Sequence, residues 1–188
     1  MMDELSLNIL DIAQNSIAAD AKLVEVEVEE SDANDTLVIR VRDDGRGMSE
    51  EFLQTVENPF VTTRTTRKIG LGISFMKEAA ELTGGNFGIK SRLGAGTTIT
   101  AEFVKSHIDR QPIGDITGTM VALITLNPAI DFALRYKVDG SEFAFSTQEA
   151  KEILGGDAEL NTPVIAAFLD EYIREHLNAI CESQVVSD

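Results

Sequence analysis

Apolar and polar residues follow two different periods in the first hundred residues of this chain. Over residues 4–18 the apolar positions recur at helical spacing, which predicts an amphipathic helix with Asn8, Asp11 and Asn15 on its polar face. Alternation over residues 23–28 and 36–41 predicts two strands joined by a loop. Two more helices and two more strands are expected, over residues 49–56, 73–82, 87–91 and 97–104.

The rest of the chain gives a weaker pattern. Residues 106–117 read as a connector, and the apolar run 120–126 predicts a strand. Asp139-Gly140 predicts a tight turn between strands over 132–138 and 142–145. Two helices should then follow, one that begins at a Ser146/Glu149 capping box and ends at Gly155, and one that begins at Thr162-Pro163. We expect residues 118–188 to form a small α/β unit that extends the main sheet or docks beside it.

Composition and charge narrow the function. The 188 residues are 43% hydrophobic and 26% charged, as in an ordinary globular protein, and the formal net charge is −16. Such an acidic chain is a poor partner for nucleic acid or for anionic membranes. No apolar run approaches eighteen residues, so we expect a soluble, cytoplasmic protein.

Positive charge is concentrated in one short segment, from Asn58 to Gly72. Arg64, Arg67 and Lys68 lie within five positions of each other, and Gly70-Leu71-Gly72 then opens a predicted helix. The first turn of a helix offers free backbone N–H groups and the positive end of the helix dipole to anions. We therefore expect this segment to hold an anion, with phosphate as the leading candidate, although the glycines alone could simply start a helix.

Two further groups of residues could carry chemistry. Asp11 and Asn15 lie four apart on one helix face, which suits a carboxylate that orients water and an amide oxygen that ligates Mg²⁺. Asp43 ends a predicted strand before Gly45 and Gly47, where it could accept a hydrogen bond from an exocyclic amino group. Taken singly, these groups could equally be a solvated helix face and an ordinary turn.

The order of the motifs is more specific than any one of them. From the N-terminus they are Asp11…Asn15, Asp43-x-Gly45-x-Gly47, Pro59-Phe60-Val61-Thr62-Thr63, Gly70-Leu71-Gly72 and Gly94-x-Gly96-Thr97-Thr98. As a set they resemble the ATP-binding core of sensor histidine kinases and, more broadly, the GHKL or Bergerat-fold ATPase superfamily. The resemblance covers residues 4–105 and implies an α/β fold, a two-layer sandwich of a mixed sheet with helices on one face. The domains expected are 1–105, a connector 106–117, and the small unit 118–188.

The resemblance also implies roles for individual residues. Asn15 would ligate Mg²⁺, Asp43 would bind the adenine amino group, Gly45 and Gly47 would shape the adenine pocket, and Thr98 would support it through a bound water. The nucleotide lid and its hinge would supply the phosphate-binding residues Thr62, Thr63, Arg64, Arg67, Lys68, Gly70 and Gly72. Asp11 stands where hydrolytic members carry Glu, so it would polarise water with a shorter reach.

The predicted function is Mg-ATP binding by a stand-alone histidine-kinase-like domain that hydrolyses ATP slowly or phosphorylates a partner protein. The helix with Asp11 begins near Met1, so we expect no phosphoacceptor hairpin before it. His107 begins a His-x-x-Arg-x-Pro sequence that echoes a phosphoacceptor site, but it also fits a plain connector. The main alternative is a non-catalytic, anti-sigma-like switch that binds a partner protein when ATP orders the lid. A degenerate acidic interaction module and a homodimer also remain open.

Overall fold

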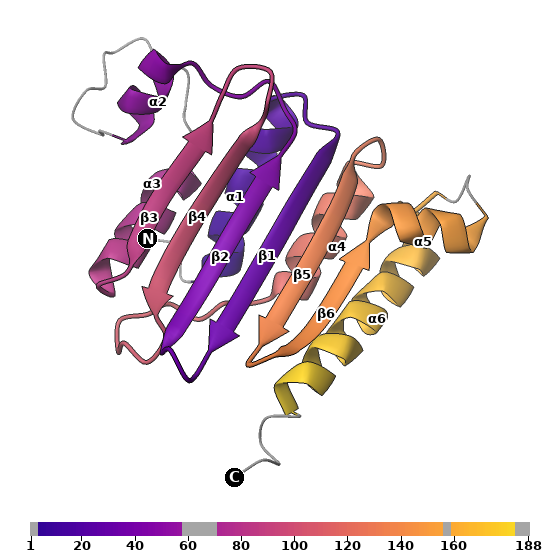
Figure 1. Cartoon of the computed structure of the whole chain (residues 1–188). Helices are drawn as coiled ribbons and strands as arrows, with labels where there is room; N and C mark the ends of the chain where they lie inside the picture. The colour runs from indigo at the N-terminus through magenta and orange to yellow at the C-terminus, as the bar shows by residue number, and fades with distance from the viewer. Residues whose placement is uncertain (1–3, 58–70, 156–158, 183–188) are drawn as a thin grey trace.

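A single six-stranded mixed sheet forms the centre of the molecule (Figure 1). The computed structural model describes residues 4–57, 71–155 and 159–182. The strands are β1 (Leu23–Ser31), β2 (Thr36–Asp43), β3 (Asn86–Ser91), β4 (Thr97–Val104), β5 (Asp131–Val138) and β6 (Ser141–Ser146). Their order is β3-β4-β2-β1-β5-β6, and all neighbours are antiparallel except β1 and β5.

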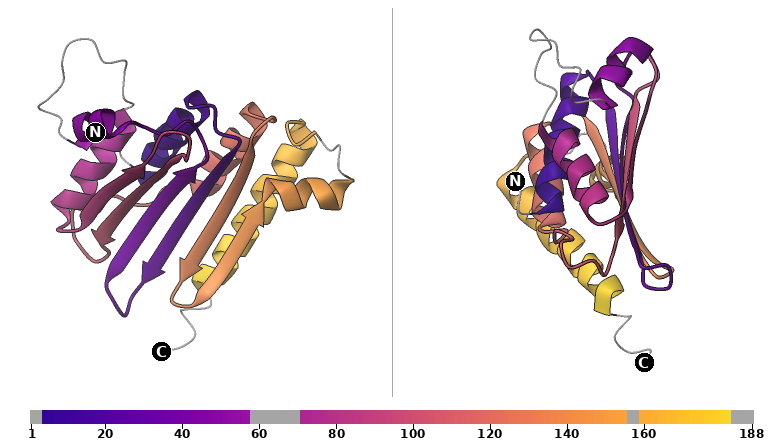
Figure 2. Two further views of the ribbon diagram at one scale, coloured as in Figure 1. Left: turned by 45° about the horizontal axis from the view of Figure 1, so that its top comes forward. Right: turned by 90° about the vertical axis from the view of Figure 1, so that its left-hand side faces the viewer.

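The described helices cover one face of this sheet and leave the other open, as Figure 2 shows edge-on. They are α1 (Leu5–Ala18), α2 (Glu50–Glu57), α3 (Leu71–Leu82), α4 (Ile116–Leu126), α5 (Thr147–Leu154) and α6 (Pro163–Glu182). Alternation in the strands explains the two faces: Val24, Val26 and Val28 of β1 are buried, while Glu25 and Glu27 between them lie on the open side. The predicted fold class, a two-layer sandwich with helices on one face, is confirmed.

The segment 120–126, predicted as a strand, is instead part of helix α4. The Asp115 side chain accepts a hydrogen bond from the Gly118 backbone at 3.0 Å and so caps the helix start. Ile116, Met120 and Leu123 are buried at helical spacing. Because α4 is almost continuously apolar, its composition could not separate a buried helix from a buried strand.

The C-terminal residues extend the main sheet, which was one of the two expected placements. β5 pairs in parallel with β1 along eight positions, and β6 returns antiparallel to β5. The predicted Asp139-Gly140 turn is confirmed, with φ of 42° and 95°. The helix starts predicted at Ser146 and Thr162 are confirmed by α5 and α6.

Candidate functional site

The site is built around Asp43, at the end of β2. The Asp43 carboxylate is 9% exposed, and all of its hydrogen-bond partners in the described structure are uncharged donors. Its Oδ2 accepts from the Ser16 hydroxyl of α1 at 2.7 Å. Its Oδ1 accepts from the backbone N–H groups of Gly45 at 2.9 Å and Thr97 at 3.2 Å. The Asp43 carboxylate is therefore held by α1, by the turn after β2 and by β4 at the wall of a cavity.

Two glycine turns bring backbone segments together beside Asp43. Gly47 has φ of +65°, and a Cβ placed there would lie 2.0 Å from the carbonyl oxygen of Arg92. Gly96 has φ of +80°, and a Cβ there would lie 1.9 Å from the carbonyl oxygen of Asp43. Only glycine tolerates both the conformation and the contact. The two turns thus form one closely packed wall of the site.

A cavity of about 500 Å³ lies between α1, α2, the start of α3 and the ends of β2 and β4. This volume lies within the range of small-molecule sites, roughly 300–1,000 Å³. Apolar side chains dominate its lining: Ile12, Met48, Phe52, Val56, Ile73, Leu93 and Ile99. The polar lining residues are Asn15, Ser16, Asp43, Arg46, Ser49 and Thr97. An apolar slot with one buried carboxylate suits a flat heterocycle that carries an amino group.

Asp11 and Asn15 lie one helical turn apart on α1, as predicted. Asp11 Oδ2 accepts a hydrogen bond from the Gly72 backbone N–H at 2.5 Å, so the carboxylate caps the start of α3. Asn15 lines the cavity, and its buried Nδ2 atom has no hydrogen-bond partner among the described residues. Asn15 and Asp43 thus line one cavity, and the contact between Asp11 and Gly72 lies at the start of α3, where Ile73 also lines that cavity.

The residues present fit a magnesium ion that is only partly held by protein. Within the described ranges, no three His, Cys, Asp or Glu side chains are grouped closely enough to hold a metal. Mg²⁺ commonly takes one or two protein oxygens and completes its shell with water and substrate phosphates. The amide oxygen of Asn15, a residue that lines the cavity, would be a suitable single ligand.

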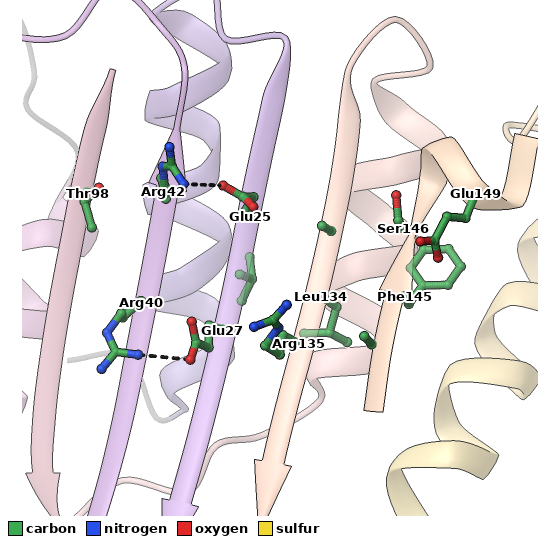
Figure 3. Close-up of a pocket in the computed structure, with 13 residues that line it drawn as sticks. Glu25, Glu27, Arg40, Arg42, Thr98, Leu134, Arg135, Phe145, Ser146 and Glu149 are labelled. Carbon is green, nitrogen blue, oxygen red and sulfur yellow. Dashed lines mark hydrogen bonds and ion pairs between the residues drawn. The ribbon is translucent and has the colours of Figure 1, made fainter. Parts of the chain in front are cut away.

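Thr98 does not lie with these residues. It faces the open side of the sheet, where it lines a separate hollow with Arg42 and Glu25 (Figure 3). Its neighbour Thr97 occupies the position beside Asp43. Alternation along β4 accounts for this, because buried Ile99 and Thr97 share the helix-covered face while Thr98 must face the other way.

Six of the predicted nucleotide-binding residues lie outside the described part of the chain: Thr62, Thr63, Arg64, Arg67, Lys68 and Gly70.

Two residues at the site, Ser16 and Phe52, were not predicted from the sequence. Ser16 follows Asn15 directly and falls on the buried face of α1, which was the available signal. Phe52 lies on predicted helix α2, which Ser49 caps through the Phe52 N–H at 3.3 Å.

Comparison with known proteins identifies this arrangement. A family model described as histidine kinase-, DNA gyrase B- and HSP90-like ATPase matches residues 1–107. Histidine protein kinase DivJ of Caulobacter vibrioides is 33% identical over 96 residues, which are 49% of this chain and 16% of the kinase. Sensor histidine kinase YvrG of Bacillus subtilis is 30% identical over 95 residues, which are 48% of this chain and 16% of the kinase. The MutL ATPase domain of Aquifex aeolicus, solved with ADP, has a TM-score of 0.49 and 15% identity over 82% of this chain and 70% of that one.

The fold is an α/β sandwich with a cavity of small-molecule size beside Asp43. The chain belongs to the family of histidine kinase-, DNA gyrase B- and HSP90-like ATPases, whose domains bind ATP. It spans 16% of the length of the two curated kinases named above. None of the described helices is both long and apolar enough to cross a membrane.

Proposed function

We propose that this chain binds Mg-ATP in the cavity beside Asp43 and hydrolyses it slowly. The observation that carries the proposal is Asp43 itself, a carboxylate that is 9% exposed, lacks a cationic partner in the described structure and faces an apolar cavity of about 500 Å³. Burying a carboxylate without a cationic partner is costly, and a further hydrogen-bond donor from a ligand would offset part of that cost. The amino group of adenine supplies the complementary donor.

Each neighbouring residue has a defined role in the proposal. Met48 and Phe52 contact the faces of the base, and Thr97 takes the supporting place that the sequence had suggested for Thr98. Asn15 ligates the magnesium ion that bridges the phosphates. The Gly72 N–H group, at the positive end of α3, donates to a phosphate oxygen.

The contact between Asp11 and Gly72 gives the proposal a specific consequence. The Gly72 N–H that would serve the phosphate donates to Asp11 Oδ2 in this structure. A phosphate oxygen must therefore displace this carboxylate, which is then free to orient a water molecule. The reaction and the release of Asp11 from α3 are coupled in this account.

The same contact favours one second candidate, a switch without catalysis. If phosphate binding only releases Asp11 from Gly72, the bond that ties α1 to α3 is lost and the surface around α3 changes. Such a switch would act on a partner protein, and transfer of phosphate to a partner is the third outcome. Labelled ATP separates these possibilities.

The test follows γ-labelled ATP with the wild-type chain, Asp11→Asn and Asn15→Ala. The proposal expects inorganic phosphate release that falls roughly 10²-fold in Asp11→Asn, the lower end of what a positioned base contributes. Binding of ATP should persist or tighten in Asp11→Asn, because the negative charge beside the phosphates is gone. Asn15→Ala should lose the Mg²⁺-dependent part of the binding.

The other outcomes are distinct. Tight binding without phosphate release or labelled protein would support the switch, and label on a partner protein would support a kinase. A melting temperature unchanged by Mg-ATP would exclude nucleotide binding and leave an interaction module.

A further inference from the structure

Strand β6 forms an open edge of the sheet, far from the nucleotide cavity. It is last in the strand order, and among the described residues its backbone ladder runs to β5 alone. Because the turn has two residues, the backbone N–H and C=O groups of Ser141, Phe143 and Phe145 are the ones that hydrogen-bond to β5. The N–H and C=O groups of Glu142 and Ala144 therefore point away from the sheet. Such an edge can accept another strand.

An aromatic surface lies next to this edge, on the helix-covered side. Helix α6 runs alongside β6 (Figure 1). The centroid of the Tyr172 ring lies 6.1 Å from the ring centroid of Phe143 and 6.4 Å from that of Phe145. Tyr172 also stacks on Phe168 at 6.0 Å. Phe168 is 56% exposed, and Val164, one turn earlier on α6, is 80% exposed. The aromatic core of this corner thus continues outward onto the surface beside β6.

Acidic residues lie near this edge on both faces of the sheet. Glu142 is exposed on β6, and Glu171 and Glu175 are exposed on α6, three positions after Phe168 and Tyr172. Residues three apart on a helix are neighbours, so Glu171 and Glu175 flank the aromatic rings, while Glu142 lies on the open face. A partner that covers the rings must offset this negative charge.

We propose that β6 and α6 form a docking site for an extended segment of a partner protein. The segment pairs with the open edge of β6 as a seventh strand. Its apolar side chains, at alternate positions, cover Phe168 and Tyr172. Its other side chains lie on the open face of the sheet and include Lys or Arg beside Glu142, a carboxylate that Arg135 also contacts at 3.5 Å. The net charge of −16 adds a general preference for such a basic partner.

A second copy of this chain is a poorer occupant, for a geometric reason. Two β6 strands paired about a two-fold axis would lie about 4.8 Å apart. Because α6 packs beside β6, this pairing would bring the two copies of α6 together in one layer, where packed helices need roughly 8–10 Å between their axes. Their carboxylates Glu171 and Glu175 would also face their own equivalents. A single strand that brings no helix into this layer avoids both conflicts.

The proposal does not depend on nucleotide binding. Asp43 and Thr97 lie on β2 and β4, whereas the docking edge is separated from β2 by β1 and β5. The two sites can therefore be tested separately in one protein.

The test selects peptides from a random twelve-residue library displayed on phage, with the full chain immobilised, and measures the binding of enriched peptides to three variants. Ala144→Pro removes one outward N–H and leaves the β5 ladder intact. Ala144→Val is the matched control, because it keeps the N–H. Phe168→Glu alters the aromatic surface alone and also serves if Ala144→Pro does not fold.

Enriched peptides should alternate apolar and basic residues. Their affinity should fall at least tenfold in Ala144→Pro and Phe168→Glu and stay unchanged in Ala144→Val, and bound peptide should slow amide exchange at Glu142 and Ala144. The proposal is overturned if no enriched peptide distinguishes these variants from the wild type. It is also overturned if ultracentrifugation shows a dimer that Ala144→Pro abolishes, since a second copy would then occupy the edge.

Discussion

The hydroxyl of Ser16 should contribute both to stability and to nucleotide binding. Ser16 is 3% exposed and donates at 2.7 Å to Oδ2 of buried Asp43. A hydrogen bond to a charged group contributes about 1.5–3 kcal/mol. In Ser16→Ala that bond is lost, while alanine improves the helix by about 0.5 kcal/mol. We therefore expect the free energy of unfolding to fall by about 1–2.5 kcal/mol.

The matched control is Ser6→Ala, on the same helix. Ser6 is 1% exposed and donates at 3.2 Å to Glu4, a carboxylate that is only partly buried. Its loss should cost less, about 1 kcal/mol or below. Urea denaturation measures both variants, and calorimetric titration with Mg-ATP should show weaker binding for Ser16→Ala alone. If Ser16→Ala is as stable as Ser6→Ala and binds Mg-ATP with wild-type affinity, the account of Asp43 positioning is refuted.

Three further variants follow from the same structure. Gly47→Ala should destabilise the chain by several times the cost of Gly94→Ala, about 1 kcal/mol, as measured by thermal melts. Both glycines have positive φ, but a Cβ meets the Arg92 carbonyl oxygen at 2.0 Å in the first case and nothing within 4 Å in the second; equal losses would contradict the packing of this wall. Burial raises the pKa of Asp131, but hydrogen bonds from Lys151 and its neighbours outweigh this and hold the pKa below its usual value. The carboxylate thus stabilises the fold above its unfolded-state pKa near 3.9, and this stability is lost as pH falls through the lower folded-state pKa. Asp131→Asn should therefore be less stable than wild type at pH 7 and converge with it at low pH in denaturation curves; a constant difference would contradict the assignment.

Much of the fold was accessible from the sequence because local patterns decide it. Alternation in residues 23–28 and 36–41 identified β1 and β2, and helical spacing identified α1. Turn and capping residues, such as Asp139-Gly140 and Ser146, located the C-terminal hairpin and α5. The parallel pairing of β1 with β5 could not be derived, since it joins segments that lie a hundred residues apart.

The places where the structure differs from the sequence-based expectations, or adds to them, have local physical reasons. The apolar segment 120–126 lacked polar positions that would reveal its period, and the cap at Asp115 was not recognised. The motif suggested Thr98 rather than Thr97. Alternation along β4 indicates the opposite, because Thr97 lies two positions before the buried Ile99 and so faces the same side of the sheet. The bond from Gly72 to Asp11 depends on how α3 packs against α1, which no local pattern shows.

The most direct test of the central claim is calorimetric titration of Mg-ATP into the wild-type chain and Asp43→Asn. Asparagine keeps the size of the side chain and one acceptor oxygen but removes the charge. The account predicts one ATP bound per chain and a loss of affinity of at least tenfold in Asp43→Asn, because the carboxylate hydrogen-bonds the adenine amino group. Equal affinity in the two proteins would show that ATP does not bind against Asp43 and would contradict the account.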